Sequence, residues 1–268
     1  MVTENLQKAM DFIDSVDLAG IPRMIVEQDA SVEAGEVFDK AKDQAAVVGS
    51  GVLGFAKGVD EDVRAAMSDA ALLAQLLADK KASSATDPVA WFTVYTAALK
   101  SMGWLVQDAT FQDYSADGTA VDVHQKVIEV LAAALGPAPA AAAIILATMN
   151  ALKGMNPESS WIRIFSREAQ HAKIARFQVG SVETPDGGSV LVSMLACLIL
   201  ANDTITQVLF FKWRQSHAAF QASGNKMSIN RNALITMHPK ILAKTQDFQN
   251  SFFSSIQDLD LTPEAGKP

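Results

Sequence analysis

Cysteine is almost absent from this sequence, which has a single one, Cys197, in 268 residues. One cysteine cannot form an internal disulfide, so the cysteine content does not indicate an oxidising compartment. Charged residues are also scarce, at 19% against 49% hydrophobic residues, and the mean hydropathy is +0.14. This composition excludes a disordered chain. It predicts that the apolar surplus is buried in a large core, in a partner interface or around a lipid.

Positive charge is in deficit. The sequence has 22 Lys and Arg residues but 30 Asp and Glu residues, which gives a net charge of −8. A chain with this balance repels nucleic acid and anionic headgroups at long range, so we expect no nucleic-acid partner. Contact with a lipid or membrane surface would have to be apolar or lipid-anchored. The apolar composition is compatible with a homodimer.

No targeting or membrane-spanning segment is expected. Met1 to Asp17 is polar and periodic, without the basic flank and apolar run of a signal peptide, which predicts a protein made in the cytoplasm. Membrane association and release both remain open. The longest uncharged stretch, Val130 to Leu152, contains Pro137 and Pro139 and is rich in alanine, so it predicts two buried helices rather than a span.

The order of patterns predicts a single α+β domain, with an antiparallel meander in the C-terminal half packed between many helices. Residues 1–173 are expected to be mainly helical, 174–235 to form antiparallel strands, and 239–257 to form a closing helix. Within the strand region, Ala222 to Asn225 (Ala-Ser-Gly-Asn) predicts a turn. In the helical half, Asp60 to Lys81 has helical periodicity, and Asp87-Pro88 is a cap followed by proline.

One predicted strand, Ser189 to Leu200, is apolar with almost no alternation. A strand that is apolar on both faces must be covered on both faces, so we expect it at the centre of the meander with helices on each side. Cys197 lies in this strand and is therefore predicted to be deeply buried.

Two motif matches lack the context that their chemistry needs. Gly49 to Gly54 fits G-x-G-x-x-G, but no strand–helix–strand unit follows, which favours a buried strand over a nucleotide site. Glu168 to His171 fits one E-x-x-H, and a di-iron site needs two. The remaining histidines, His124, His217 and His238, are scattered. We therefore expect neither nucleotide nor metal, and we assign no catalytic residue.

Cys197 admits three interpretations. It can be a plain core thiol, since free cysteine is among the most buried residue types. It can be a catalytic nucleophile, which needs a basic neighbour such as His171 or His217 to form thiolate. It can also carry an acyl chain as a thioester inside an apolar cavity, where the exclusion of water would protect the bond and each buried methylene contributes about 0.8 kcal/mol.

The chain resembles the Evf-type virulence factors, a bacterial family named for an Erwinia virulence factor. The resemblance is one of layout, in the helical first half, the segment Arg167 to Gln178, the cysteine strand and the segment Ile205 to Trp213. It implies an α/β fold that binds lipid vesicles and carries palmitate in thioester linkage to a buried cysteine. It also implies a role in bacterial persistence in an insect gut, without an established enzymatic activity. Cys197 alone matches that cysteine.

The preferred hypothesis is thus a virulence-associated lipid-binding protein, able to associate with membranes, whose covalent palmitoyl group is attached to Cys197. Leu195, Ile199 and the alanine-rich stretch Ala140 to Lys153 are expected to line the cavity. The alternatives are a cysteine-dependent acyltransferase or thioesterase, and a non-enzymatic interaction protein with a plain core cysteine.

Overall fold

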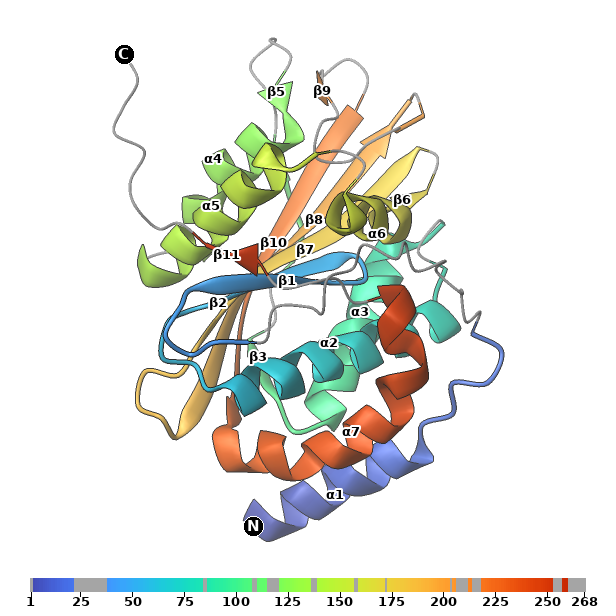
Figure 1. Cartoon of the computed structure of the whole chain (residues 1–268). Coiled ribbons are helices and arrows are strands. Elements are labelled where there is room, and N and C mark those ends of the chain that lie inside the picture. Colours follow the sequence, from blue (N-terminus) through green and yellow to red (C-terminus); the bar gives the residue numbers. More distant parts are fainter. Residues whose placement is uncertain are drawn as a thin grey trace.

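The computed structural model describes most of the chain. The described residues are 2–21, 38–83, 86–107, 110–114, 121–135, 139–156, 159–171, 173–202, 204–205, 212–213, 218–252 and 257–259. Their elements form three layers, with a mostly antiparallel sheet between two groups of helices (Figure 1). The predicted α+β class is confirmed.

The main sheet has nine strands within the described residues, in the order β11-β1-β2-β7-β8-β10-β3, with β4 beside β10 and β6 beside β7. The bounds are β1 Gln44–Val48, β2 Gly51–Phe55, β3 Leu105–Gln107, β4 Gln112–Tyr114, β6 Gln170–His171, β7 Ile174–Glu183, β8 Ser189–Ala201, β10 Ala218–Asn230 and β11 Gln257–Asp258. A separate pair joins β5 Val121–Asp122 to β9 Lys212–Trp213. The predicted meander is present as β7-β8-β10, and the apolar strand β8 lies at its centre.

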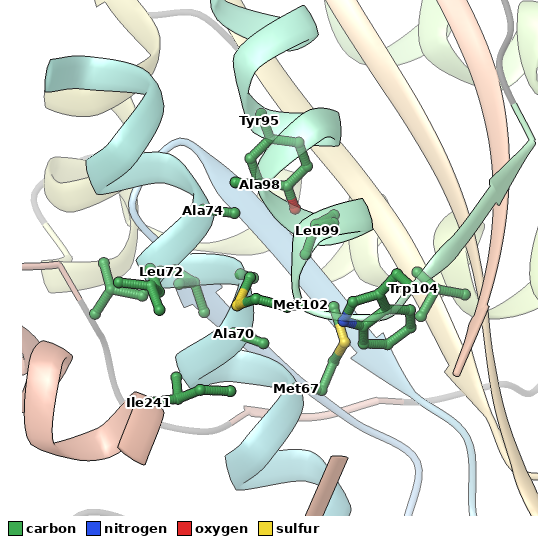
Figure 2. Close-up of a cluster of buried hydrophobic side chains, with 14 of the residues drawn as sticks. Met67, Ala70, Leu72, Ala74, Tyr95, Ala98, Leu99, Met102, Trp104 and Ile241 are labelled. Carbon is green, nitrogen blue, oxygen red and sulfur yellow. The ribbon is translucent and has the colours of Figure 1, made fainter. Parts of the chain in front are cut away.

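One helical layer contains α1 Val2–Ser15, α2 Glu61–Lys81, α3 Pro88–Ser101 and α7 Arg231–Phe252. The predicted cap of α3 is present, because the Asp87 side chain accepts a hydrogen bond from the Ala90 amide and Pro88 follows it. Figure 2 shows how Met67 and Leu72 of α2, Leu99 of α3 and Ile241 of α7 meet in one cluster. This cluster also takes in the β8 side chains that face the layer, so one core joins the helices to the sheet.

The other helical layer is a hairpin of α4 Val123–Leu135 and α5 Pro139–Gly154, with α6 Ser160–Ala169 nearby (Figure 1). The alanine-rich stretch is thus two helices, as predicted, and no described helix is long and apolar enough to cross a membrane. Glycines let this layer approach the sheet. A Cβ at Gly54 would lie 2.5 Å from Ile144 Cγ2, and one at Gly224 would overlap the carbonyl of Ala134.

Several sequence predictions are corrected. Ala222 to Asn225 does not turn but continues through β10, because Gly224 serves the close approach of α4 rather than a bend. The closing helix begins at Arg231 instead of residue 239, because the Asn230 side chain caps it by accepting a hydrogen bond from the Ala233 amide. Pro239 lies inside this helix. Within the predicted helix, Gln257 belongs to a strand. Residues 1–173 hold six of the described helices and also contribute strands to the sheet, which is compatible with their predicted mainly helical character. One of these strands, β2, pairs in parallel with β7.

Candidate functional site

Cys197 lies in the middle of the central strand and faces the α4–α5 hairpin. In the sheet register Phe177 of β7 and Ala222 of β10 flank it on either side. Its side chain is completely buried, and it belongs to a cluster of buried hydrophobic residues. The predicted depth of Cys197 and the coverage of its strand on both faces are therefore present in the structure.

Leu195 and Ile199 share the face of Cys197, because successive side chains of a strand alternate between faces. Both are buried and both belong to the same apolar cluster. Buried side chains of α5, including Ile145 and Met149, complete this cluster from the hairpin. The structure therefore brings the proposed cavity residues together around the thiol. Their role as walls of a lipid site stays a prediction.

Burial raises the pKa of the Cys197 thiol far above its usual range, with no charged neighbour contributing to the shift. Tyr114 on β4 interacts electrostatically with Cys197. The pKa of Tyr114 is raised by burial and, to a lesser degree, by charge on Cys197. A thiol in this setting is protonated at neutral pH. It lacks the electropositive neighbour that activates catalytic cysteines, as far as the described residues extend.

The two histidines suggested as partners do not complete a catalytic pair in the described structure. His171 forms part of β6, where burial and then the charge of Arg176 lower its pKa. Cys197 makes no contribution to that shift. His217 lies outside the described residues, and the side chain of His124 does too. His238 is placed elsewhere, with its Nε2 atom 2.8 Å from Asp69 Oδ2.

The structure also contains a buried polar centre, built around Arg176 of β7. The Arg176 side chain is 3% exposed and its guanidinium lies 3.5 Å from the ring centroid of Trp91. Nη2 donates to Asp79 at 3.1 Å, and Nη1 donates to the hydroxyl of Ser50 at 2.6 Å. Asp79 also accepts a 2.6 Å hydrogen bond from Trp91 Nε1. A single buried cation thus links the sheet to α2, α3 and the β1–β2 turn.

The electrostatics of this centre are dominated by burial rather than by attraction. Burial raises the pKa of Asp79, although Arg176 acts in the opposite direction. Burial also lowers the pKa of Arg176 to about 10, despite the nearby carboxylates of Asp79 and Glu168. The pKa of Glu168 is raised by its own burial as well. Both partners of the ion pair are therefore shifted toward their neutral forms, as expected where desolvation exceeds the Coulombic gain.

This centre is not evident from the sequence, because Arg176 and Asp79 are 97 positions apart. The available signal was the alternation at the start of β7, where Arg176 and Gln178 alternate with the apolar Ala175, Phe177 and Val179.

The glycine-rich motif lies next to this polar centre. Gly49, Ser50 and Gly51 form the tight turn and the start of the second strand of the β1–β2 hairpin, and Ser50 donates two hydrogen bonds to Gln75 Oε1. This antiparallel hairpin is not the strand–helix–strand unit that a dinucleotide site needs.

Metal binding has no support among the described residues, where no group of three or more His, Cys, Asp or Glu side chains is arranged to hold an ion. The single E-x-x-H has a structural role instead. Glu168 at the end of α6 accepts a 2.6 Å hydrogen bond from Arg167 Nε, while His171 has passed into β6.

These observations define an α+β protein with a mostly antiparallel sheet enclosed by two helical layers and one buried thiol. No family model and no curated protein matches the chain. Among solved structures it is similar to a delta-endotoxin, with 12% identity over 82% of this chain and 96% of that one, at a TM-score of 0.35. It is also similar to the structure of the Evf virulence factor, with 10% identity over 84% of this chain and 86% of that one, at a TM-score of 0.28. The second neighbour bears the name of the family that the sequence resembles. Similarity at these scores carries no argument about function.

Proposed function

We propose that this chain is a virulence-associated lipid-binding protein of the Evf type, carrying one fatty acyl group in thioester linkage to Cys197. The observation that supports the proposal is the setting of this sole thiol, which lies at the centre of the sheet, under an alanine-rich hairpin and within an apolar shell. In such a shell water is excluded, which protects a thioester from hydrolysis. Each buried methylene would add about 0.8 kcal/mol of stabilisation.

Acylation requires the α4–α5 hairpin to move away from the sheet. In the closed arrangement the raised pKa of Cys197 keeps the thiol protonated, and the carbonyl of Ala134 lies against Gly224 next to the thiol's strand. Once the hairpin opens, the Cys197 sulfur attacks the carbonyl carbon of an acyl thioester donor. A new carbon–sulfur bond forms, the donor thiolate leaves, and it takes the proton that Cys197 loses. Closure of the hairpin then buries the acyl chain.

Membrane association follows from the same movement. A hairpin that parts from the sheet exposes the apolar sides of both α4 and α5, together with the acyl chain. Since the net charge is −8, this contact would depend on apolar burial rather than on attraction to anionic headgroups.

The test is the intact mass of the purified protein before and after neutral hydroxylamine, which cleaves thioesters. We expect a mass excess of one fatty acyl group that is lost on treatment. Cys197→Ala and Cys197→Ser should both lack it, and the alanine variant avoids placing an unpaired hydroxyl in an apolar core. An unmodified mass in the native protein, or an acyl group retained by both variants, would refute the proposal.

The enzymatic alternative gains no comparable support. An acyl-transfer enzyme needs a thiol that deprotonates readily, close to a base. Burial opposes deprotonation of Cys197, and no described charged group lowers the pKa of its thiol. We therefore propose the acyl group as a stable component rather than an intermediate of turnover.

A further inference from the structure

An open pocket lies on the same face of the sheet as Cys197, at the end away from the thiol. It has a volume of about 530 Å³ and is formed by β3, β7, β8 and β10. The β8 side chains Leu191 and Ser193 line it, and Cys197 follows four residues after Ser193. At about 3.3 Å per residue, the pocket and the thiol are separated by roughly 13 Å. The tight contact of Gly224 with Ala134 lies between them.

The strand register arranges the pocket in two rows of side chains. One row runs Glu183, Leu191, Ser228 and Leu105 across the four strands. Its two leucines are among the few large apolar side chains exposed in the described structure, Leu105 at 75% and Leu191 at 38%. These two leucines give the open pocket an apolar surface on this side.

The neighbouring row is polar and rich in hydrogen-bond donors. It runs Ser181, Ser193, Lys226 and Gln107. The exposed Lys226 ammonium has no ion-pair or hydrogen-bond partner among the described residues. At the buried end of the row, the Ser181 hydroxyl is fully enclosed and has no hydrogen-bond partner there either. Ser181 itself does not line the pocket, so this row presents to it the single positive charge of Lys226. Lys226 lies beside the exposed Leu105 and Leu191 of the first row, and the Glu183 carboxylate stands two strands away at the end of that row.

We propose that this pocket binds a small amphipathic anion, a carboxylate with one apolar chain or ring. Its carboxylate pairs with Lys226, and its apolar part lies against Leu105 and Leu191. The volume suits such a ligand, since small-molecule pockets range over about 300–1,000 Å³ with apolar walls and a few placed polar groups. This site is distinct from the thiol and does not depend on acylation of Cys197.

The experiment is a titration with decanoate below its micellar concentration, followed by calorimetry and by saturation-transfer NMR. Decyltrimethylammonium serves as the probe of equal chain length and opposite charge. The native protein should bind decanoate in preference to the cation. Lys226→Glu should weaken decanoate binding by about tenfold and reverse the preference between the two probes, because the charge of the row is inverted. An unchanged preference would overturn the proposal, as would the absence of decanoate binding by the native protein.

Two further variants localise the ligand. Leu191→Asp should lose both probes, whereas Leu200→Asp on the same strand but outside the pocket should bind normally, and both leucines are 38% exposed. Leu105→Asp provides a second pocket variant at a more exposed position. Equal losses in Leu191→Asp and Leu200→Asp would refute the site. Loss of decanoate binding in Cys197→Ala would also refute it, because the ligand would then lie at the thiol.

Discussion

Arg176 of β7 and Asp79 of α2 form an ion pair of 3.1 Å across the interface between the sheet and one helical layer, but they are unequally buried. The Arg176 side chain is 3% exposed and the Asp79 side chain is 28% exposed. Removing one partner therefore has different consequences from removing the other. If Arg176 is replaced, the carboxylate of Asp79 can be hydrated. If Asp79 is replaced, the guanidinium of Arg176 stays buried without its partner.

The first prediction follows from this asymmetry. Asp79→Ala should reduce the free energy of unfolding by about 3 kcal/mol, because it leaves a buried guanidinium without its carboxylate and Trp91 Nε1 without its acceptor. Arg176→Met should cost clearly less, since methionine fills the space without a charge. Urea unfolding measures both. In the double variant, most of the loss caused by Asp79→Ala should be recovered, and purely additive losses would contradict the argument.

An exposed ion pair provides the control for these Asp79 and Arg176 variants. Lys80 lies next to Asp79 in the chain and pairs with Asp17 at 2.9 Å, with side chains that are 33% and 71% exposed. Asp17→Ala should leave the free energy of unfolding nearly unchanged, because exposed ion pairs contribute little. A loss similar to that of Asp79→Ala would show that burial does not set the difference.

The second prediction concerns pH and uses two carboxylates near the β7–β8 turn. Burial raises the pKa of Glu183 above its usual 4.5, so the folded chain binds a proton more tightly than the unfolded chain there. Its contribution to stability is then complete below about pH 4.5 and is lost as the pH rises through the raised value. Glu183→Gln should flatten this fall in a series of urea unfolding curves across pH 4 to 7.

The pKa of Asp186 is shifted in the opposite direction from that of Glu183. The amides of Ser189 and Gly188 donate hydrogen bonds to its carboxylate and lower its pKa below the usual 3.8. The contribution of Asp186 to stability is present above pH 3.8, its usual pKa, and is lost as the pH falls through its lowered pKa in the folded protein. Asp186→Asn should therefore remove stability at neutral pH but not at the acid end. Identical pH profiles for Glu183→Gln and Asp186→Asn would contradict both assignments.

The third prediction tests how closely the α4–α5 hairpin approaches the sheet. Gly224→Ala should destabilise the protein by about 1–3 kcal/mol, because the added methyl meets the backbone of Ala134, which cannot rotate away. Gly154→Ala, at the end of α5, meets nothing within 4 Å and should be neutral or mildly stabilising. Thermal unfolding of the two variants compares them directly. A native-like Gly224→Ala would mean that the hairpin is not seated as described.

Gly224 also shows where sequence reasoning reached its limit. A glycine between serine and asparagine predicts a turn when only local preference is considered, but here it accommodates the backbone of another helix, a contact that no local pattern encodes. By contrast, the pattern of Ser189 to Leu200 predicts its central place, because a strand apolar on both faces has few other positions in a sheet. The same pattern predicts the depth of Cys197. The Arg176 centre depends on partners far apart in the chain, so the sequence offered only an unexplained cation in an apolar strand.

The last prediction concerns access to Cys197. The thiol is fully buried and its pKa is raised, so alkylation by N-ethylmaleimide requires an opening of the hairpin or global unfolding. After removal of any acyl group with hydroxylamine, the native protein should react at least a thousandfold more slowly than the protein in urea, which corresponds to an opening free energy of about 4 kcal/mol. Gly224→Ala should react faster than the native protein at the same pH, because the added methyl weakens the closed state. Gly154→Ala should not. If the native thiol reacts as fast as the unfolded one, the hairpin does not cover Cys197 and the protected-thioester proposal fails with it.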